Sequence, residues 1–225
     1  MGKQPYCVGW HGQAALSLAR ALTSPPRYDD FVQHSDGTIR KYRRCFNQPG
    51  QAHELTFSCH RGLKMLERDR TRQWFIEALD RARHTWRFDF WAYVIMPEHA
   101  HVPLLPRELD YDVALILKGI KQSVSRRAVG FLAEHAPQWL TQSKVTWPGG
   151  RTEHRFWQQG GGYDRNVVTA DVAWKSVEYI HNNPVRRGLV AGPTDWERSS
   201  ARWYAGYADV KLAMDGCPPD PRVRL

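Results

Sequence analysis

The chain has 225 residues, with 32 Lys and Arg against 23 Asp and Glu, which gives a formal net charge of +9 and a sequence pI near 9.6. This length suits one ordinary domain with a full hydrophobic core. The basic balance is typical of proteins that bind polyanions, so nucleic acid is the first partner to consider, although solubility alone can also account for the charge.

The four cysteines lie far apart and form no C-x-x-C pair, at Cys7, Cys45, Cys59 and Cys217. Neither a zinc knuckle nor a dense disulfide framework is indicated, and reduced cytosolic thiols fit best. No stretch of about 18 apolar residues occurs, so we expect a protein that is neither secreted nor membrane-spanning.

The chain divides by pattern into an N-terminal extension over residues 1–39, one domain over residues 40–208 and a C-terminal tail over residues 209–225. The extension holds a Ser24-Pro25-Pro26 break and a turn signal at residues 35–37 but no repeated period. Neither end segment carries a pattern that assigns it a role.

The first regular elements of the domain are a strand and a helix. Residues 52–60 alternate Leu55, Phe57 and Cys59 with polar neighbours, which predicts a half-buried strand. Residues 71–84 place Trp74, Phe75, Ala78, Leu79 and Ala82 on one helical stripe, which predicts a helix that covers the sheet.

Two further strands and two helices follow. Residues 88–96 and 99–105 predict strands joined by a tight Pro97-Glu98 turn. A helix with a basic polar face is predicted from Val113 towards Glu134, and another begins after the cap residue Thr169 and ends before Pro184. This order predicts an α+β domain with an antiparallel sheet covered by helices on one face.

A His-x-His pair opens the second of these strands. On a strand, the spacing of His99 and His101 sends both imidazoles to the same face, where they can share a metal ion. Ten histidines in 225 residues give about 0.4 such pairs by chance, so two ordinary histidines near a strand end are the alternative.

The segment EYIHNNPVRRGLV places a tyrosine and an asparagine one helical turn apart. Tyr179 and Asn183 therefore project from the same face, where a nucleophile and a metal ligand can lie together. The alternative is a helix that ends at Pro184, with Tyr179 at the edge of the core and Asn182 and Asn183 as capping residues.

Taken together, WAYVIMPEHAHVPLLP and the later EYIHNNPVRRGLV resemble the REP-associated tyrosine transposases, a branch of the single-tyrosine HUH transposase superfamily. Further agreement comes from YRR at Tyr42, RFWQQGGGYDRNVV from Arg155 and DWERSSARWY from Asp195. The resemblance covers about residues 40 to 208.

The resemblance implies a ferredoxin-like antiparallel sheet covered by helices, in the HUH architecture. It implies a metal ion on His99 and His101, and Tyr179 as the nucleophile that attacks a DNA phosphate. Asn183 matches the polar residue that completes the metal site in the family, and its amide oxygen favours Mg²⁺ or Mn²⁺ over zinc.

The implied activity is metal-dependent cleavage and strand transfer of single-stranded or hairpin DNA through a 5′-phosphotyrosine, which amounts to DNA transposition. No nucleotide fingerprint appears, and none is needed for an exchange of phosphodiesters. We expect a protein of the bacterial cytosol, associated with the nucleoid, as a monomer or homodimer. Basic and aromatic residues are the expected DNA contacts, namely Arg43, Arg44, Lys118, Lys121, Arg126, Arg127, Arg155, Trp157, Arg186 and Arg187.

Three features depart from the family pattern: the small Ala100 inside the histidine pair, Pro103 in its strand, and the glycine run 160–162. Pro103 is expected to end its strand early or to leave its N–H side unpaired. A domesticated DNA-binding protein that recognises palindromic repeats without cleavage is therefore an alternative, and a nuclease that activates water is another. Tyr163, expected in a glycine-flanked loop, is a rival nucleophile to Tyr179.

Overall fold

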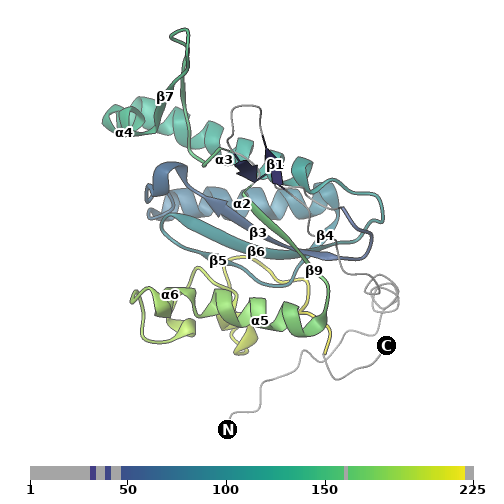
Figure 1. Ribbon diagram of the computed structural model, residues 1–225. Coiled ribbons are helices and arrows are strands. Elements are labelled where there is room, and N and C mark those ends of the chain that lie inside the picture. Colours follow the sequence, from purple (N-terminus) through teal and green to yellow (C-terminus); the bar gives the residue numbers. More distant parts are fainter. Residues whose placement is uncertain (1–30, 34–38, 42–46, 160–161, 221–225) are drawn as a thin grey trace.

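The structure, a computed structural model, describes residues 31–33, 39–41, 47–159 and 162–220 (Figure 1). Before the main domain, β1 (Phe31–Gln33) and β2 (Ile39–Lys41) pair antiparallel. Most of the predicted N-terminal extension lies outside the described residues, as do Arg43 and Arg44. No helix of the described chain has the length and apolar character needed to cross a membrane.

The central sheet is antiparallel and has the strand order β4-β6-β3-β9, with β5 also paired to β6. Its strands are β3 (Ala52–Ser58), β4 (Phe88–Phe90), β5 (Val94–Ile95), β6 (His99–Pro106) and β9 (Tyr163–Val167). Helix α2 (Asp69–Trp86) connects β3 to β4, and α3 (Val113–His135) lies between β6 and β9. This topology confirms the predicted ferredoxin-like α+β fold.

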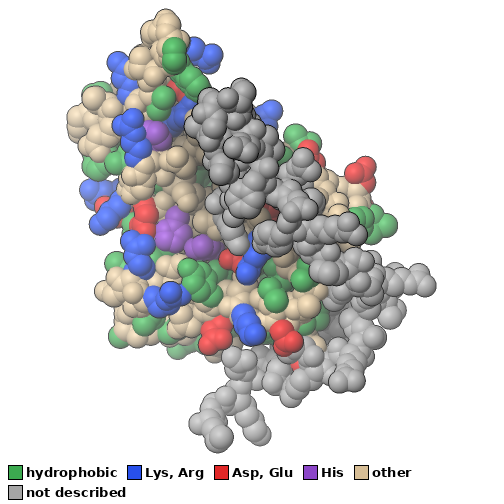
Figure 2. Space-filling model, viewed as in Figure 1, with side chains coloured by type: hydrophobic (Ala, Val, Ile, Leu, Met, Phe, Trp, Pro, Cys, Tyr) green, Lys and Arg blue, Asp and Glu red, His purple; other side chains and the backbone are tan. Residues whose placement is uncertain are grey.

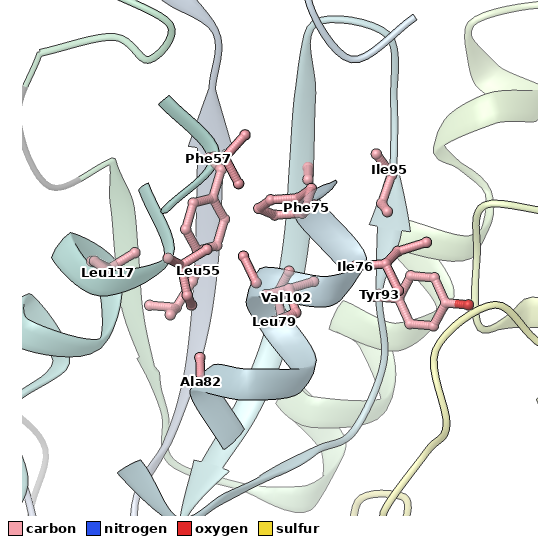
Figure 3. Close-up of a cluster of buried hydrophobic side chains, with 14 of the residues drawn as sticks. Leu55, Phe57, Phe75, Ile76, Leu79, Ala82, Tyr93, Ile95, Val102 and Leu117 are labelled. Atoms are coloured by element: carbon pink, nitrogen blue, oxygen red, sulfur yellow. The ribbon is translucent and has the colours of Figure 1, made fainter. Parts of the chain in front are cut away.

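One face of the sheet packs against α2 and α3 and forms the main core (Figure 3). Leu55 and Phe57 of β3 and Val102 of β6 are fully buried there, because alternate residues of a strand point to one face. Phe57 and Phe75 of α2 meet edge to face with ring centres 5.2 Å apart. The apolar stripe predicted for α2 is the face that it buries.

Helix α5 (Ala170–His181) covers the opposite face (Figure 1). The Thr169 side chain caps it by accepting from the Val172 backbone N–H, as the sequence predicts. Small clusters of buried residues join α5 to the sheet, including Val167 with Ala173, and Val94 with Val177. The prediction of helices on one face only was wrong, because the central strands bury side chains on both faces.

Pro103 does not end its strand: β6 continues to Pro106 and pairs with β3 from His99 to Leu104. The Pro103 carbonyl accepts from the Trp91 backbone N–H at 3.1 Å, so the side of Pro103 that lacks a donor faces the interval between β4 and β5. The edge of Pro103 that has no N–H donor, as expected from the sequence, therefore points towards the break between β4 and β5.

Several elements escape the sequence patterns. Helix α4 (Pro137–Ser143) leads into a hairpin of β7 (Lys144–Thr146) and β8 (Thr152–His154) that projects from the domain (Figure 1). The short helices are η1 (His60–Gly62), α6 (Asn183–Arg186), η2 (Pro193–Asp195) and α7 (Ala201–Tyr204).

The described part of the C-terminal tail packs against the domain. Leu212 is buried and its backbone N–H donates to the Tyr93 hydroxyl at 3.3 Å. Asp215 accepts from the Phe90 backbone N–H at 3.0 Å, and Trp174 Nε1 donates to the Pro219 carbonyl at 2.8 Å. These contacts tie residues 212–219 to both the sheet and α5.

Candidate functional site

The two histidines of the His-x-His pair begin β6, directly after the turn at Pro97 and Glu98. His99 pairs in register with Ser58 and His101 with Thr56. Their ring centres lie 5.0 Å apart, as the spacing on a strand predicts. Ala100 between them is fully buried in the core under α2 and α3, so the histidines face α5.

Each imidazole has a polar partner at Nδ1. His101 Nδ1 lies 3.0 Å from Thr56 Oγ1, and His99 Nδ1 lies 3.1 Å from Glu98 Oε1. With the proton on Nδ1 and shared with these oxygens, Nε2 of each ring presents a lone pair, the arrangement that orients histidine ligands of metals.

Burial lowers the pKa of His101 to about 4, and the neighbouring His99 adds to this effect. Burial also lowers the pKa of His99, against the opposing influence of Glu98. Both imidazoles are therefore neutral near pH 7, the state in which a histidine can bind a metal ion.

The end of α5 brings Tyr179 to the histidines, and the start of α6 brings Asn183. The Tyr179 ring is 45% exposed and lies edge-on to His101, with ring centres 6.0 Å apart. Asn183 is buried, and its Nδ2 lies 3.3 Å from His101 Nε2. Asn182 is the C-cap of α5 and keeps helical backbone angles, so the one-turn spacing of Tyr179 and Asn183 is preserved into α6.

The donor set at this point suits a hard divalent cation. Two imidazole nitrogens come from β6, and rotation of the Asn183 amide by half a turn exchanges the positions of Nδ2 and Oδ1. Among the described residues no group of three or more His, Cys, Asp or Glu suits a metal ion. The two imidazoles and the Asn183 amide oxygen form a candidate donor set, of a kind that favours Mg²⁺ or Mn²⁺.

Two arginines of the Asn-Pro-Val-Arg-Arg segment stand at the same site. The Arg186 guanidinium carbon lies 4.8 Å from the centre of the Tyr179 ring. Arg187 forms an ion pair with Glu98 at 2.9 Å, and Glu98 in turn contacts His99. Figure 2 shows histidine side chains at the surface on this face, with Lys and Arg side chains beside them.

A basic cleft of about 760 Å³ lies between α3 and the end of β8 with the segment that follows it. Lys121, Arg126 and Arg155, three of the predicted DNA contacts, line it together with His154. Burial lowers the pKa of Lys121 to about 8. The cleft is open to solvent and carries mostly positive charge, which suits a phosphate backbone.

The chain is similar in sequence and in fold to known proteins. No protein-family model matches the chain. A protein of Haemophilus influenzae named as a REP-associated tyrosine transposase is 24% identical over 197 residues, which are 83% of this chain and 98% of that protein. A solved structure of a REP-associated tyrosine transposase bound to a REP hairpin matches with a TM-score of 0.57 and 21% identity, covering 83% of this chain and 98% of that one. The chain resembles the REP-associated tyrosine transposases.

Two of the predicted DNA contacts, Trp157 and Arg127, contact other parts of the protein. Trp157 is 5% exposed, and its Nε1 donates to the Lys121 carbonyl at 3.1 Å. It is a core residue rather than the expected DNA contact, because its segment pairs with Cys59 at the end of β3. Arg127 turns towards α2, where it contacts Glu77, whereas Lys118 is exposed on α3.

The prediction that Tyr163 lies in a loop was wrong, because it begins β9 and pairs in register with Thr56. Gly162 before it has φ of +84°, and a Cβ there would lie 2.2 Å from the Thr56 carbonyl oxygen. This member of the glycine run is thus needed for the close approach of β9 to β3.

Sequence reasoning missed the residues that support the site. Thr56 and Glu98 contact the two histidines, and Glu54 lies buried two residues before Thr56 on β3. Arg165 of β9 and Lys175 of α5 line the cleft beside Tyr179. Only Lys175 carries a local signal, because it precedes Tyr179 by one helical turn.

Proposed function

We propose that this chain cleaves and rejoins single-stranded DNA at hairpin-forming repeats through a covalent bond between Tyr179 and a 5′ phosphate. One observation carries the proposal: the exposed Tyr179 on α5 lies beside two buried side chains, the neutral imidazole of His101 and the amide of Asn183. A nucleophile next to a candidate metal site is an arrangement that supports phosphodiester transfer without a nucleotide cofactor.

His99, His101 and Asn183 would hold Mg²⁺ or Mn²⁺. A divalent ion held there would supply positive charge that stabilises the charge developing on the scissile phosphate. The histidines and Asn183 come from β6 and from the start of α6, two elements fixed by the core, so the donors keep their places relative to Tyr179.

In the proposed step the Tyr179 hydroxyl oxygen attacks phosphorus in line with the leaving 3′ oxygen. The P–O3′ bond breaks as the bond between the Tyr179 oxygen and phosphorus forms. Tyrosine loses one proton, and the leaving 3′ oxygen takes up one proton to become a hydroxyl. Arg186 beside the ring stabilises negative charge on the phenol oxygen and on the phosphate.

The reverse attack by a 3′ hydroxyl on the phosphotyrosine rejoins the strand. Each step replaces one phosphate ester with another, so strand transfer needs no external energy source. A 3′ hydroxyl from a different strand in this second step gives transposition instead of religation.

Hairpin DNA is the proposed substrate for two reasons. The matched structure is that of a REP-associated tyrosine transposase bound to a REP hairpin. The basic cleft of Lys121, Arg126 and Arg155 offers a surface for a phosphate backbone near the site. The stem would lie along this cleft, while an unpaired flank reaches Tyr179.

The test is a covalent-adduct assay with a labelled DNA hairpin that carries single-stranded flanks, taken from the repeats around the gene of this chain. With Mg²⁺ or Mn²⁺, a protein-linked DNA band is expected on a denaturing gel and should disappear with EDTA and in Tyr179→Phe. Tyr207→Phe is the matched control, because Tyr207 is also exposed and also lies under an arginine.

Other outcomes identify the alternatives. Hairpin binding with no covalent band in any metal would establish a DNA-binding protein without cleavage. Cleavage that survives Tyr179→Phe would contradict the proposal and point to hydrolysis by water or to attack by Tyr163.

A further inference from the structure

A second cleft, of about 520 Å³, opens directly beside Tyr179 and His101, between β3, β9 and α5. The proposed cleavage step uses neither Glu54 at its floor nor Arg165 and Lys175 at its sides. Because Tyr179 and His101 form one wall, a strand whose phosphate reaches Tyr179 places a neighbouring nucleotide at this cleft.

Glu54 is an unusual residue for such a position. It lies in the middle of β3, is only 5% exposed, and faces Arg165 directly across the β3–β9 pairing. Arg165 donates to Glu54 Oε2 at 2.5 Å and Ser176 Oγ donates to the same oxygen at 2.9 Å. The other carboxylate oxygen of Glu54, Oε1, accepts neither of these two hydrogen bonds.

A purely structural role explains only part of this arrangement. The bond to Ser176 ties α5 to the sheet, but an apolar residue would pack there without the cost of burying a carboxylate. The Arg165 side chain is 42% exposed, so the pair is not sealed in the core. A buried acceptor and a reachable donor therefore line the same cleft, as in sites that read the edge of a base.

We propose that Glu54 and Arg165 read an unpaired nucleobase next to the scissile phosphate, and that this base carries an exocyclic amino group. The inference rests on the proposed function, since it assigns the strand at Tyr179 to the cleft. The Glu54 carboxylate accepts from the amino group, and Arg165 donates to a ring nitrogen or carbonyl of the same base.

Lys175 has a different part in the same site. It is exposed on α5 one turn before Tyr179, so its ammonium group lies on the face of the helix that the strand must approach. A lysine there contacts the backbone phosphate, which is the same for every base. Glu54 and Arg165 therefore set base preference, whereas Lys175 sets affinity alone.

The experiment uses the full chain and a set of DNA hairpins with single-stranded flanks, in which each nucleotide beside the cleavage position is A, C, G or T in turn. Binding is measured by fluorescence anisotropy with Tyr179→Phe protein, and cleavage by the adduct assay with active protein. At one position, an amino-bearing base should be preferred over T by roughly tenfold or more.

Glu54→Gln keeps the shape of the side chain and should reduce this preference to within about threefold, whereas Lys175→Gln should weaken all substrates equally. Lys211→Gln, away from the cleft, controls for loss of charge. Melting temperatures identify any variant that fails to fold. If Glu54→Gln does not fold, Glu54→Asp, which keeps the carboxylate, takes its place. Glu54→Asp should then change the base preference rather than leave it as in the wild type.

The inference is overturned if T is accepted as well as the other bases at every position, or if folded Glu54 variants keep the wild-type preference. Failure of the proposed chemistry looks different: wild-type protein then gives no adduct, while base preference in the binding assay still decides the role of Glu54. If the protein neither binds nor cleaves the hairpin DNA, both proposals are contradicted.

Discussion

The Arg186 guanidinium carbon lies 4.8 Å from the centre of the Tyr179 ring, and Asn183 lies between these two residues in the chain. The candidate nucleophile, a candidate metal ligand and a cation thus come from one segment of eight residues, across the junction of α5 and α6. Since Pro184 is accommodated near the start of α6, this junction keeps helical spacing through a proline.

Arg186→Ala is expected to slow formation of the Tyr179 adduct by on the order of a hundredfold, because a cation next to the developing negative charge is lost. Single-turnover rates at saturating DNA measure this effect apart from binding. Arg202→Ala removes a similar cation from above Tyr207, at 4.3 Å, and should leave the rate unchanged. Equal rates for Arg186→Ala and wild type would show that the ring contact has no part in the step.

Thr56→Val should weaken Mn²⁺ binding by roughly 10- to 100-fold, because His101 loses the oxygen that orients its ring through Nδ1. Isothermal titration of the protein with Mn²⁺ measures this without any DNA. Thr56→Ser keeps the hydroxyl and should retain most of the affinity. If Thr56→Val binds Mn²⁺ like the wild type, His101 does not ligate through Nε2 as inferred.

DNA affinity should depend on pH through Lys121, whose pKa burial lowers to about 8. The ammonium group is charged below this value and neutral above it, so affinity for hairpin DNA should fall as pH rises from 7 to 9, by on the order of tenfold at most. The fall should vanish in Lys121→Arg, because a guanidinium keeps its charge over this range.

Anisotropy titrations across this pH range test the expectation at constant ionic strength, since phosphate contacts are sensitive to salt. Lys118→Arg, three residues earlier on α3, should leave the pH dependence in place. A pH dependence that persists in Lys121→Arg would assign the titration to another group.

The sequence reveals the parts of the site that depend on local spacing. His99 and His101 share a face because a strand alternates, and Tyr179 and Asn183 share one because a helix repeats. The apolar periodicity of α2 and α3 also depends on local spacing and predicts both helices. These features can be predicted without knowing which segments of the chain lie next to one another in the fold.

The parts that could not be predicted depend on pairing across long stretches of chain. The segment of β9 has no alternation of apolar residues, so neither the strand nor the pairing of Arg165 with Glu54 has a local signal. The same holds for Thr56, which matters only because its register partner is His101. Trp157 was misjudged because an exposed and a buried tryptophan look alike in a sequence.

Packing between α2 and α3 gives a test of the fold that is independent of function. A Cβ added at Gly119 would lie 2.0 Å from the far edge of the Trp86 ring, whereas nothing lies within 4 Å of one added at Gly130 on the same helix. Gly119→Ala should therefore destabilise the protein by about 1–2 kcal/mol, since displacing Trp86 outweighs the gain in helix propensity. Gly130→Ala should stabilise it by about 0.5–1 kcal/mol, because only the propensity changes.

Urea unfolding of both variants measures these differences in the free energy of unfolding. A control distinguishes the clash with Trp86 from general strain in α3: Gly119→Ala is repeated in a Trp86→Ala background. The clash is absent there, so the same substitution should become neutral or stabilising. Equal stability of Gly119→Ala and Gly130→Ala in the otherwise wild-type chain would mean that the Trp86 ring does not rest on Gly119. Helix α2 would then have to pack against α3 in another way at this end of the core.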